Sequence, residues 1–130
     1  MKTILLVDDS RVTRNLMTVY LVAKDVTVLE AEDGEDALTK MRSQRPDIVL
    51  ADLRMPKLDG PSMCMAMRHD PALRTIPVVI LTSNRDAESL ARCRAAGARE
   101  VLFKPIQPTP LLAAVQRVLS SVASSSVRYS

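Results

Sequence analysis

The chain has 130 residues, a formal net charge of +3 and 47% hydrophobic residues, with no Trp and one Phe. This length fits one domain with a single core, which must be built from Val, Leu, Ile, Ala and Met. The small charge does not argue for nucleic-acid binding. No run approaches the roughly 20 apolar residues of a membrane span, so we expect a cytoplasmic protein that binds neither nucleic acid nor membrane.

Apolar runs alternate along the chain with segments of helical periodicity. We expect strands at Ile4–Val7, Val26–Glu30, Asp47–Ala51, Val78–Leu81 and Val101–Phe103. Such continuous runs, without polar alternation, are typical of a parallel sheet that is covered on both faces. The repeated order of strand and helix predicts a doubly wound α/β sandwich with right-handed crossovers.

The helices between these runs carry start and stop signals. Ser10 is an N-cap for the first helix, and Pro46 stops the second. The third runs from near Leu58 or Gly60 to about His69. The fourth ends at Gly97, and Thr109-Pro110 begins the fifth. The apolar residues at helical spacing are Val12, Leu16, Val19 and Ala23 in the first helix, Ala37, Leu38 and Met41 in the second, and Leu111, Leu112, Val115, Val118 and Leu119 in the fifth.

The composition changes after Leu119, where a Ser-rich segment begins. Such a segment has no apolar face to bury, so residues 121–130 are predicted to be a flexible tail, or the start of a linker. The remaining residues, 1–120, form the predicted domain.

Polar groups follow four of the apolar runs at the point where each run ends. These groups are Asp8-Asp9, Asp52, Thr82 and Lys104-Pro105. Ligands of parallel α/β sheets bind beyond the carboxyl ends of the strands. The sequence therefore predicts that three carboxylates, a hydroxyl and an ammonium converge on one site.

Crowded carboxylates repel one another, and a divalent cation or an ammonium relieves the repulsion. Mg²⁺ prefers oxygen ligands and takes one or two carboxylates together with phosphate oxygens and water. A carboxylate can also attack phosphorus and become an aspartyl phosphate. Asp52 as nucleophile, Asp8 and Asp9 as Mg²⁺ ligands, Thr82 as hydroxyl and Lys104 as counter-cation supply the groups that phosphoryl transfer needs.

These residues resemble the receiver domains of two-component response regulators, from about Lys2 to Leu119. The motifs that carry the resemblance are Asp8-Asp9, Asp52-Leu53-Arg54-Met55-Pro56, Asp59-Gly60, Leu81-Thr82-Ser83, Ala96-Gly97-Ala98 and Lys104-Pro105. The resemblance implies a flavodoxin-like (βα)5 sandwich, with a five-stranded parallel sheet of order 2-1-3-4-5 and helices on both faces.

The resemblance also implies a role for each site residue. Asp52 is the phospho-acceptor for a histidine kinase or phosphotransfer protein. Mg²⁺ is held by Asp9, Asp52 and the backbone carbonyl of Arg54, with Asp8 acting largely through water. Thr82 follows the phosphoryl group inward, and Lys104 pairs with it. The bond between Lys104 and Pro105 is expected to be cis.

Three further positions are expected to modulate the site. Arg54 and Asn84 lie two residues beyond Asp52 and Thr82, where side chains control attack of water on the acyl phosphate in this family. Val101 stands where the family usually has a switching aromatic residue, three positions before the lysine. Because valine has no ring to swing, we expect the signal to pass through the fourth helix and the loop before it.

The sequence is consistent with several functions and partners. The resemblance implies a phosphorylation-operated switch that meets a downstream protein through the fourth helix, fifth strand and fifth helix, as a monomer or a phosphorylation-dependent dimer. It implies a signalling protein that catalyses only its own phosphorylation and dephosphorylation. The alternatives are a degenerate receiver acting as a constitutive scaffold, and an aspartate-nucleophile phosphohydrolase. The sequence fits either a stand-alone regulator or a fragment of a larger one.

Overall fold

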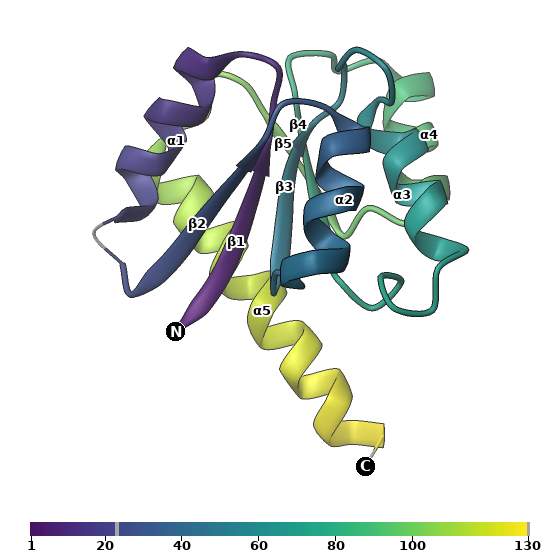
Figure 1. Ribbon diagram of the computed structural model, residues 1–130. Helices are drawn as coiled ribbons and strands as arrows, with labels where there is room; N and C mark the ends of the chain where they lie inside the picture. The colour runs from purple at the N-terminus through teal and green to yellow at the C-terminus, as the bar shows by residue number, and fades with distance from the viewer. Residues whose placement is uncertain (23, 130) are drawn as a thin grey trace.

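Five strands alternate with five helices in a computed structural model of the protein (Figure 1). The structure describes residues 1–22 and 24–129. The elements are β1 Lys2–Val7, α1 Arg11–Val22, β2 Val26–Ala31, α2 Gly34–Gln44, β3 Ile48–Asp52, α3 Gly60–Arg68, β4 Val78–Thr82, α4 Ala87–Ala96, β5 Glu100–Phe103 and α5 Pro108–Tyr129. Each predicted strand is present, with its ends within two residues of the predicted ones.

The strands form one parallel sheet of order β2-β1-β3-β4-β5. Helices α1 and α5 cover one face of the sheet, and α2, α3 and α4 cover the other (Figure 1). The predicted α/β sandwich and its strand order are confirmed. Because every strand runs in the same direction, all five carboxyl ends lie at the same edge, above the sheet in Figure 1.

Two apolar cores lie on opposite faces of the sheet, where the chain length predicted a single one, because a sheet covered on both faces divides the core. Consecutive residues of β1 alternate between them: Leu5 and Val7 pack with α2, α3 and α4, whereas Ile4 and Leu6 pack with α1 and α5. All four side chains are buried. A central strand with two covered faces needs apolar residues at every position, which explains the continuous apolar runs in the sequence.

Aspartate side chains begin three of the helices. Asp33, Asp59 and Asp86 each accept a hydrogen bond from the backbone N–H three residues later, at the starts of α2, α3 and α4. This arrangement satisfies N–H groups that have no partner within the helix. Gly97 ends α4 with a φ of 100°, a left-handed conformation that favours glycine and that confirms the predicted stop.

Helix α1 exposes the apolar residues that mark it in the sequence. Ser10 caps the helix as predicted, since its Oγ accepts a hydrogen bond from the N–H of Thr13. However, Val12, Leu16 and Val19 are exposed, and the buried residues are Met17 and Leu21. Their spacing of four residues places these two on the face that meets the sheet. Ala23, the last residue of the apparent stripe, lies outside the described residues.

Helix α5 starts close to its predicted cap and continues through the Ser-rich segment. It begins at Pro108, one residue before the predicted cap Thr109, because proline is well accommodated in a first turn. It continues to Tyr129, so no element boundary falls after residue 120 (Figure 1). The flexibility of residues 121–130 stays a prediction. No helix among the described residues has both the length and the apolar composition needed to cross a membrane.

Candidate functional site

The polar residues at the strand ends lie together at one edge of the sheet. Asp8 and Asp9 follow β1, Asp52 and Thr82 are the last residues of β3 and β4, and Lys104 follows β5. One carboxylate oxygen from each of the three aspartates lies within 4.8 Å of the other two. The parallel sheet therefore brings together residues that are as much as 96 positions apart in the chain.

Lys104 lies between two of these carboxylates. Its Nζ is 3.1 Å from Asp52 Oδ1 and 3.5 Å from Asp8 Oδ2. Burial raises the pKa of Asp52; Lys104 opposes this rise and Asp8 adds to it. Burial disfavours the charged form of Lys104, but Asp52 and Asp8 outweigh burial and hold the pKa of Lys104 above its usual range. The ammonium is thus charged and directed at the carboxylate cluster.

Asp8 has one oxygen that is suited to a cation. The side chain is 4% exposed, and its Oδ2 is buried without a hydrogen-bond partner in the described part of the chain. A buried carboxylate oxygen normally has a hydrogen-bond partner, and the single ammonium of Lys104 compensates only part of the charge of three carboxylates. The donor set is all oxygen, as Mg²⁺ prefers, so the residues present fit a hard divalent cation.

A cleft of about 220 Å³ opens beside Asp52, lined also by Arg54, Thr82, Asn84 and Lys104. The buried Thr82 accepts a hydrogen bond at Oγ1 from the N–H of Asn84, at 2.9 Å. The side chain of Asn84 bonds to residues of the same loop and of α4, donating to Ser89 Oγ at 3.0 Å. Asp52 therefore faces a space large enough for a small polar group.

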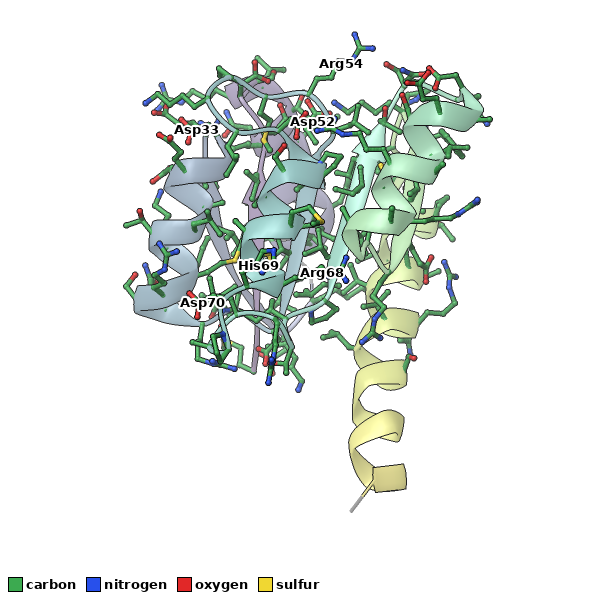
Figure 2. The ribbon with its side chains drawn as sticks, turned by 90° about the vertical axis from the view of Figure 1, so that its right-hand side faces the viewer. Asp33, Asp52, Arg54, Arg68, His69 and Asp70 are labelled. Atoms are coloured by element: carbon green, nitrogen blue, oxygen red, sulfur yellow. The ribbon has the colours of Figure 1, made fainter. Side chains whose placement is uncertain are left out.

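Arg54 is exposed, and Figure 2 shows its side chain projecting beyond the carboxyl edge of the sheet, above Asp52. Its charge lowers the pKa of Asp86, at the start of α4, although the hydrogen bonds that Asp86 accepts from Ser89 contribute more. Arg54 therefore overhangs the cleft. The peptide bond between Lys104 and Pro105 is cis, as the sequence resemblance implies.

Strand β5 has valine at position 101, where the family usually has an aromatic residue, but it carries an aromatic residue two positions later, Phe103. Val101 is half-buried on the α4 side of β5, and Phe103, two residues later, projects from the same face of the strand. The Arg85 guanidinium carbon lies 4.1 Å from the centre of the Phe103 ring. Sequence reasoning missed this pair, although Phe103 is the one Phe in the chain and directly precedes Lys104.

Comparisons with known proteins show the family to which the chain belongs. The family model of the response regulator receiver domain matches residues 4–116. Protein PilG of Pseudomonas aeruginosa is 32% identical over 113 residues, which are 87% of this chain and 84% of PilG. The gliding motility regulatory protein of Myxococcus xanthus is 41% identical over 101 residues, which are 78% of this chain and 13% of that protein. The chain spans about half the length of several other curated relatives.

A solved structure shows the same fold. The receiver domain of a sensor histidine kinase from Pseudomonas aeruginosa, solved with a magnesium ion coordinated in its active-site cleft, superimposes with a TM-score of 0.85. The two are 31% identical, and the match covers 92% of this chain and 98% of that one. With the fold, the strand-end carboxylates and the family match in agreement, the chain belongs to the response regulator receiver domain family, the signalling switches of two-component systems.

Proposed function

We propose that this protein is a switch operated by phosphorylation of Asp52, with Mg²⁺ as cofactor and a histidine kinase or phosphotransfer protein as donor. The observation that carries the proposal is the position of Lys104, whose ammonium lies 3.1 Å from Asp52 and 3.5 Å from Asp8 in a cluster of three carboxylates. A purely structural ion pair would not require two additional carboxylates beside it.

Each residue of the cluster has a task in the proposed transfer. An oxygen of Asp52 attacks phosphorus, and the bond from phosphorus to the donor nitrogen breaks as the new bond forms. Asp8, Asp9, Asp52 and the backbone carbonyl of Arg54 would hold Mg²⁺, which supplies positive charge for the phosphoryl oxygens. Lys104 pairs with another of these oxygens, and the hydroxyl of Thr82 donates to a third.

The test is the formation of an aspartyl phosphate. The protein is incubated with acetyl phosphate and Mg²⁺, and intact mass spectrometry measures the fraction that carries one phosphoryl group. We expect an adduct in the natural protein and none in Asp52→Asn, which keeps the shape of the side chain but removes its nucleophilic charge. Chelation of Mg²⁺ should also abolish the adduct.

Two outcomes would count against the proposal. An adduct that survives in Asp52→Asn would place the phosphoryl group on another residue. No adduct with acetyl phosphate, or with a panel of phosphorylated histidine kinases and phosphotransfer proteins, would favour a receiver that acts as a constitutive scaffold.

Arg54 is proposed to control how long the phosphoryl group persists. Its exposed side chain overhangs the cleft, where it can screen the acyl phosphate from water or pair with it. We expect Arg54→Ala to change the rate of dephosphorylation, by up to about tenfold if one charged hydrogen bond is lost. Measurement of the adduct over time after removal of the donor checks this, with Lys57→Ala, on the same loop, as control. Equal lifetimes of the phosphoryl adduct in Arg54→Ala and the natural protein would contradict this role of Arg54.

The signal is proposed to leave the site through the loop of residues 83–86 and α4, toward a downstream protein that contacts α4, β5 and α5. Asn84 and Val101 are placed to modulate this step, because Asn84 links the loop to Ser89 of α4 and Val101 packs beneath α4. Crystal structures with and without beryllofluoride, a mimic of the phosphoryl group, should show the loop displaced. An unmoved loop in the two structures would contradict this route.

A further inference from the structure

Three polar groups of Asp8 form hydrogen bonds with neighbours, and the fourth meets the ammonium of Lys104 at 3.5 Å without a hydrogen bond. Its backbone N–H donates to the carbonyl of Ala31 at 3.1 Å, and its Oδ1 accepts from the N–H of Ser10 at 2.8 Å. Its backbone carbonyl accepts from Nη1 of Arg14 at 2.6 Å. The remaining group, Oδ2, is the buried oxygen that faces the carboxylate cluster. Asp8 is thus fixed on three sides, with its Oδ2 directed into the site beside Lys104.

Arg14 is the one side chain that supplies any of these three bonds, and it is itself held in place. Its side chain is 14% exposed, and its Nε donates to Oε1 of Glu30, on the edge strand β2, at 2.9 Å. The guanidinium is planar and rigid, so the bond to Glu30 sets the direction in which Nη1 points. The result is a bridge from β2 through α1 to the peptide group between Asp8 and Asp9.

We propose that Arg14 is a positioning residue for the divalent-cation site. This inference rests on the function proposed above. Arg14 contacts no cation. It fixes the plane of the peptide that joins Asp8 to Asp9, and thereby the places of both carboxylates. Loss of a group that hydrogen-bonds to a metal ligand and orients it commonly lowers metal affinity tenfold or more.

A positioning role and a purely electrostatic role of Arg14 predict opposite changes in Mg²⁺ affinity when Arg14 is replaced. If Arg14 acted only as a nearby positive charge, it would repel Mg²⁺, so removal of the charge would tighten Mg²⁺ binding. If Arg14 orients the peptide, the loss of its hydrogen bond lets the Asp8 and Asp9 carboxylates move and weakens Mg²⁺ binding. The sign of the change in affinity therefore separates the two roles.

The experiment measures the Kd of Mg²⁺ alone, by isothermal titration calorimetry of the phosphate-free protein. We expect Arg14→Gln to weaken Mg²⁺ binding roughly tenfold. Arg14→Lys keeps the charge but lacks the planar fork, so it should recover only part of the affinity. Arg11→Gln is the matched control, because exposed Arg11 lines the same surface groove as Arg14, and no hydrogen bond or ion pair from Arg11 is found among the described residues. It should bind Mg²⁺ as the natural protein does.

Circular dichroism melting without Mg²⁺ confirms that each variant is folded at the temperature of the titration. If Arg14→Gln is unfolded there, Arg14→Lys decides, because a charge-only role predicts no change and a positioning role predicts weaker binding. Equal or tighter binding in Arg14→Gln, or equal weakening in Arg11→Gln, overturns the inference.

A different result would contradict the proposed function, independently of the inference on Arg14. If the natural protein and Asp9→Asn bind Mg²⁺ equally, no cation occupies the carboxylate cluster, and the cofactor proposal is lost whatever Arg14 does.

Discussion

Replacement of Lys104 by methionine is expected to slow phosphorylation of Asp52 by about 10²–10³-fold, the usual effect of losing one preorganised electrostatic donor. The Nζ lies 3.1 Å from Asp52 Oδ1, where it can meet the charge that develops on the transferring group. The same substitution removes a cation from beside the carboxylates, so Mg²⁺ should bind more tightly. Slower transfer together with tighter Mg²⁺ binding is the combination expected for Lys104.

The pH dependence supplies a second readout for Lys104→Met. Burial raises the pKa of Asp52, and Lys104 opposes that rise, so the pKa should rise further without the ammonium. The attacking carboxylate must be ionised, and the rate falls as the pH drops through its pKa. At a fixed Mg²⁺ concentration, this fall should begin at higher pH in Lys104→Met.

Rates of adduct formation from acetyl phosphate, measured by mass spectrometry between pH 5 and pH 9, test both expectations for Lys104. Lys104→Arg keeps the positive charge and should retain more activity than Lys104→Met, although its planar group cannot occupy the same space. An unchanged rate in Lys104→Met would show that the ammonium is not directed at the reacting group.

Gly60→Ala is expected to lower both the stability and the reactivity of the protein. A Cβ on Gly60 would lie 2.7 Å from the backbone oxygen of Asp52 and 2.9 Å from Cδ1 of Ile80. A backbone atom cannot move aside cheaply, so the free energy of unfolding should fall by about 1–3 kcal/mol. The displaced atom belongs to Asp52 itself. A shift of about 1 Å at a reacting group can cost about a hundredfold in rate.

Gly97→Ala is the matched control for Gly60→Ala. Gly97 has a φ of 100°, so alanine there is strained by about 1–2 kcal/mol. Its Cβ would meet only Cδ of Arg68, at 3.5 Å, at the end of α4 that is remote from the cleft. Urea unfolding measures stability, and the phosphorylation rate is measured on the folded protein. Both variants should be less stable, but only Gly60→Ala should be slow to phosphorylate. Equal rates would show that Gly60 serves packing alone.

The strands and several of the helix ends could be predicted from the sequence, because they depend on local interactions. A buried parallel strand must be apolar at every position, and helix caps need particular residues such as Ser10 and Gly97. The order of polar groups at the strand ends was enough to predict which residues lie together, since parallel strands share one carboxyl edge. Asp52, Thr82 and Lys104 meet at that edge as expected.

The buried face of a helix was harder to predict, because periodicity does not say whether a neighbouring element covers an apolar stripe. In α1 the conspicuous stripe of Val12, Leu16 and Val19 is exposed, and Met17 and Leu21 face the core. The sequence signals placed the start of α5 one residue late and gave no last residue for this helix. The helix continues to Tyr129 from an apolar stripe that packs on the sheet, and the flexibility of its Ser-rich end stays a prediction.

The sequence by itself determined the fold class, the parallel sheet and the set of residues at its carboxyl edge, because burial and strand direction leave few alternatives. Only the tertiary structure decided which side chains from other parts of the chain contact the residues at and beside this edge. Arg14 reaches the carbonyl of Asp8 across a turn of helix, and Arg85 stacks on Phe103 from a separate loop. Such contacts depend on the packing of α1 and of the loop before α4 against the sheet, and no local pattern in the chain records that geometry.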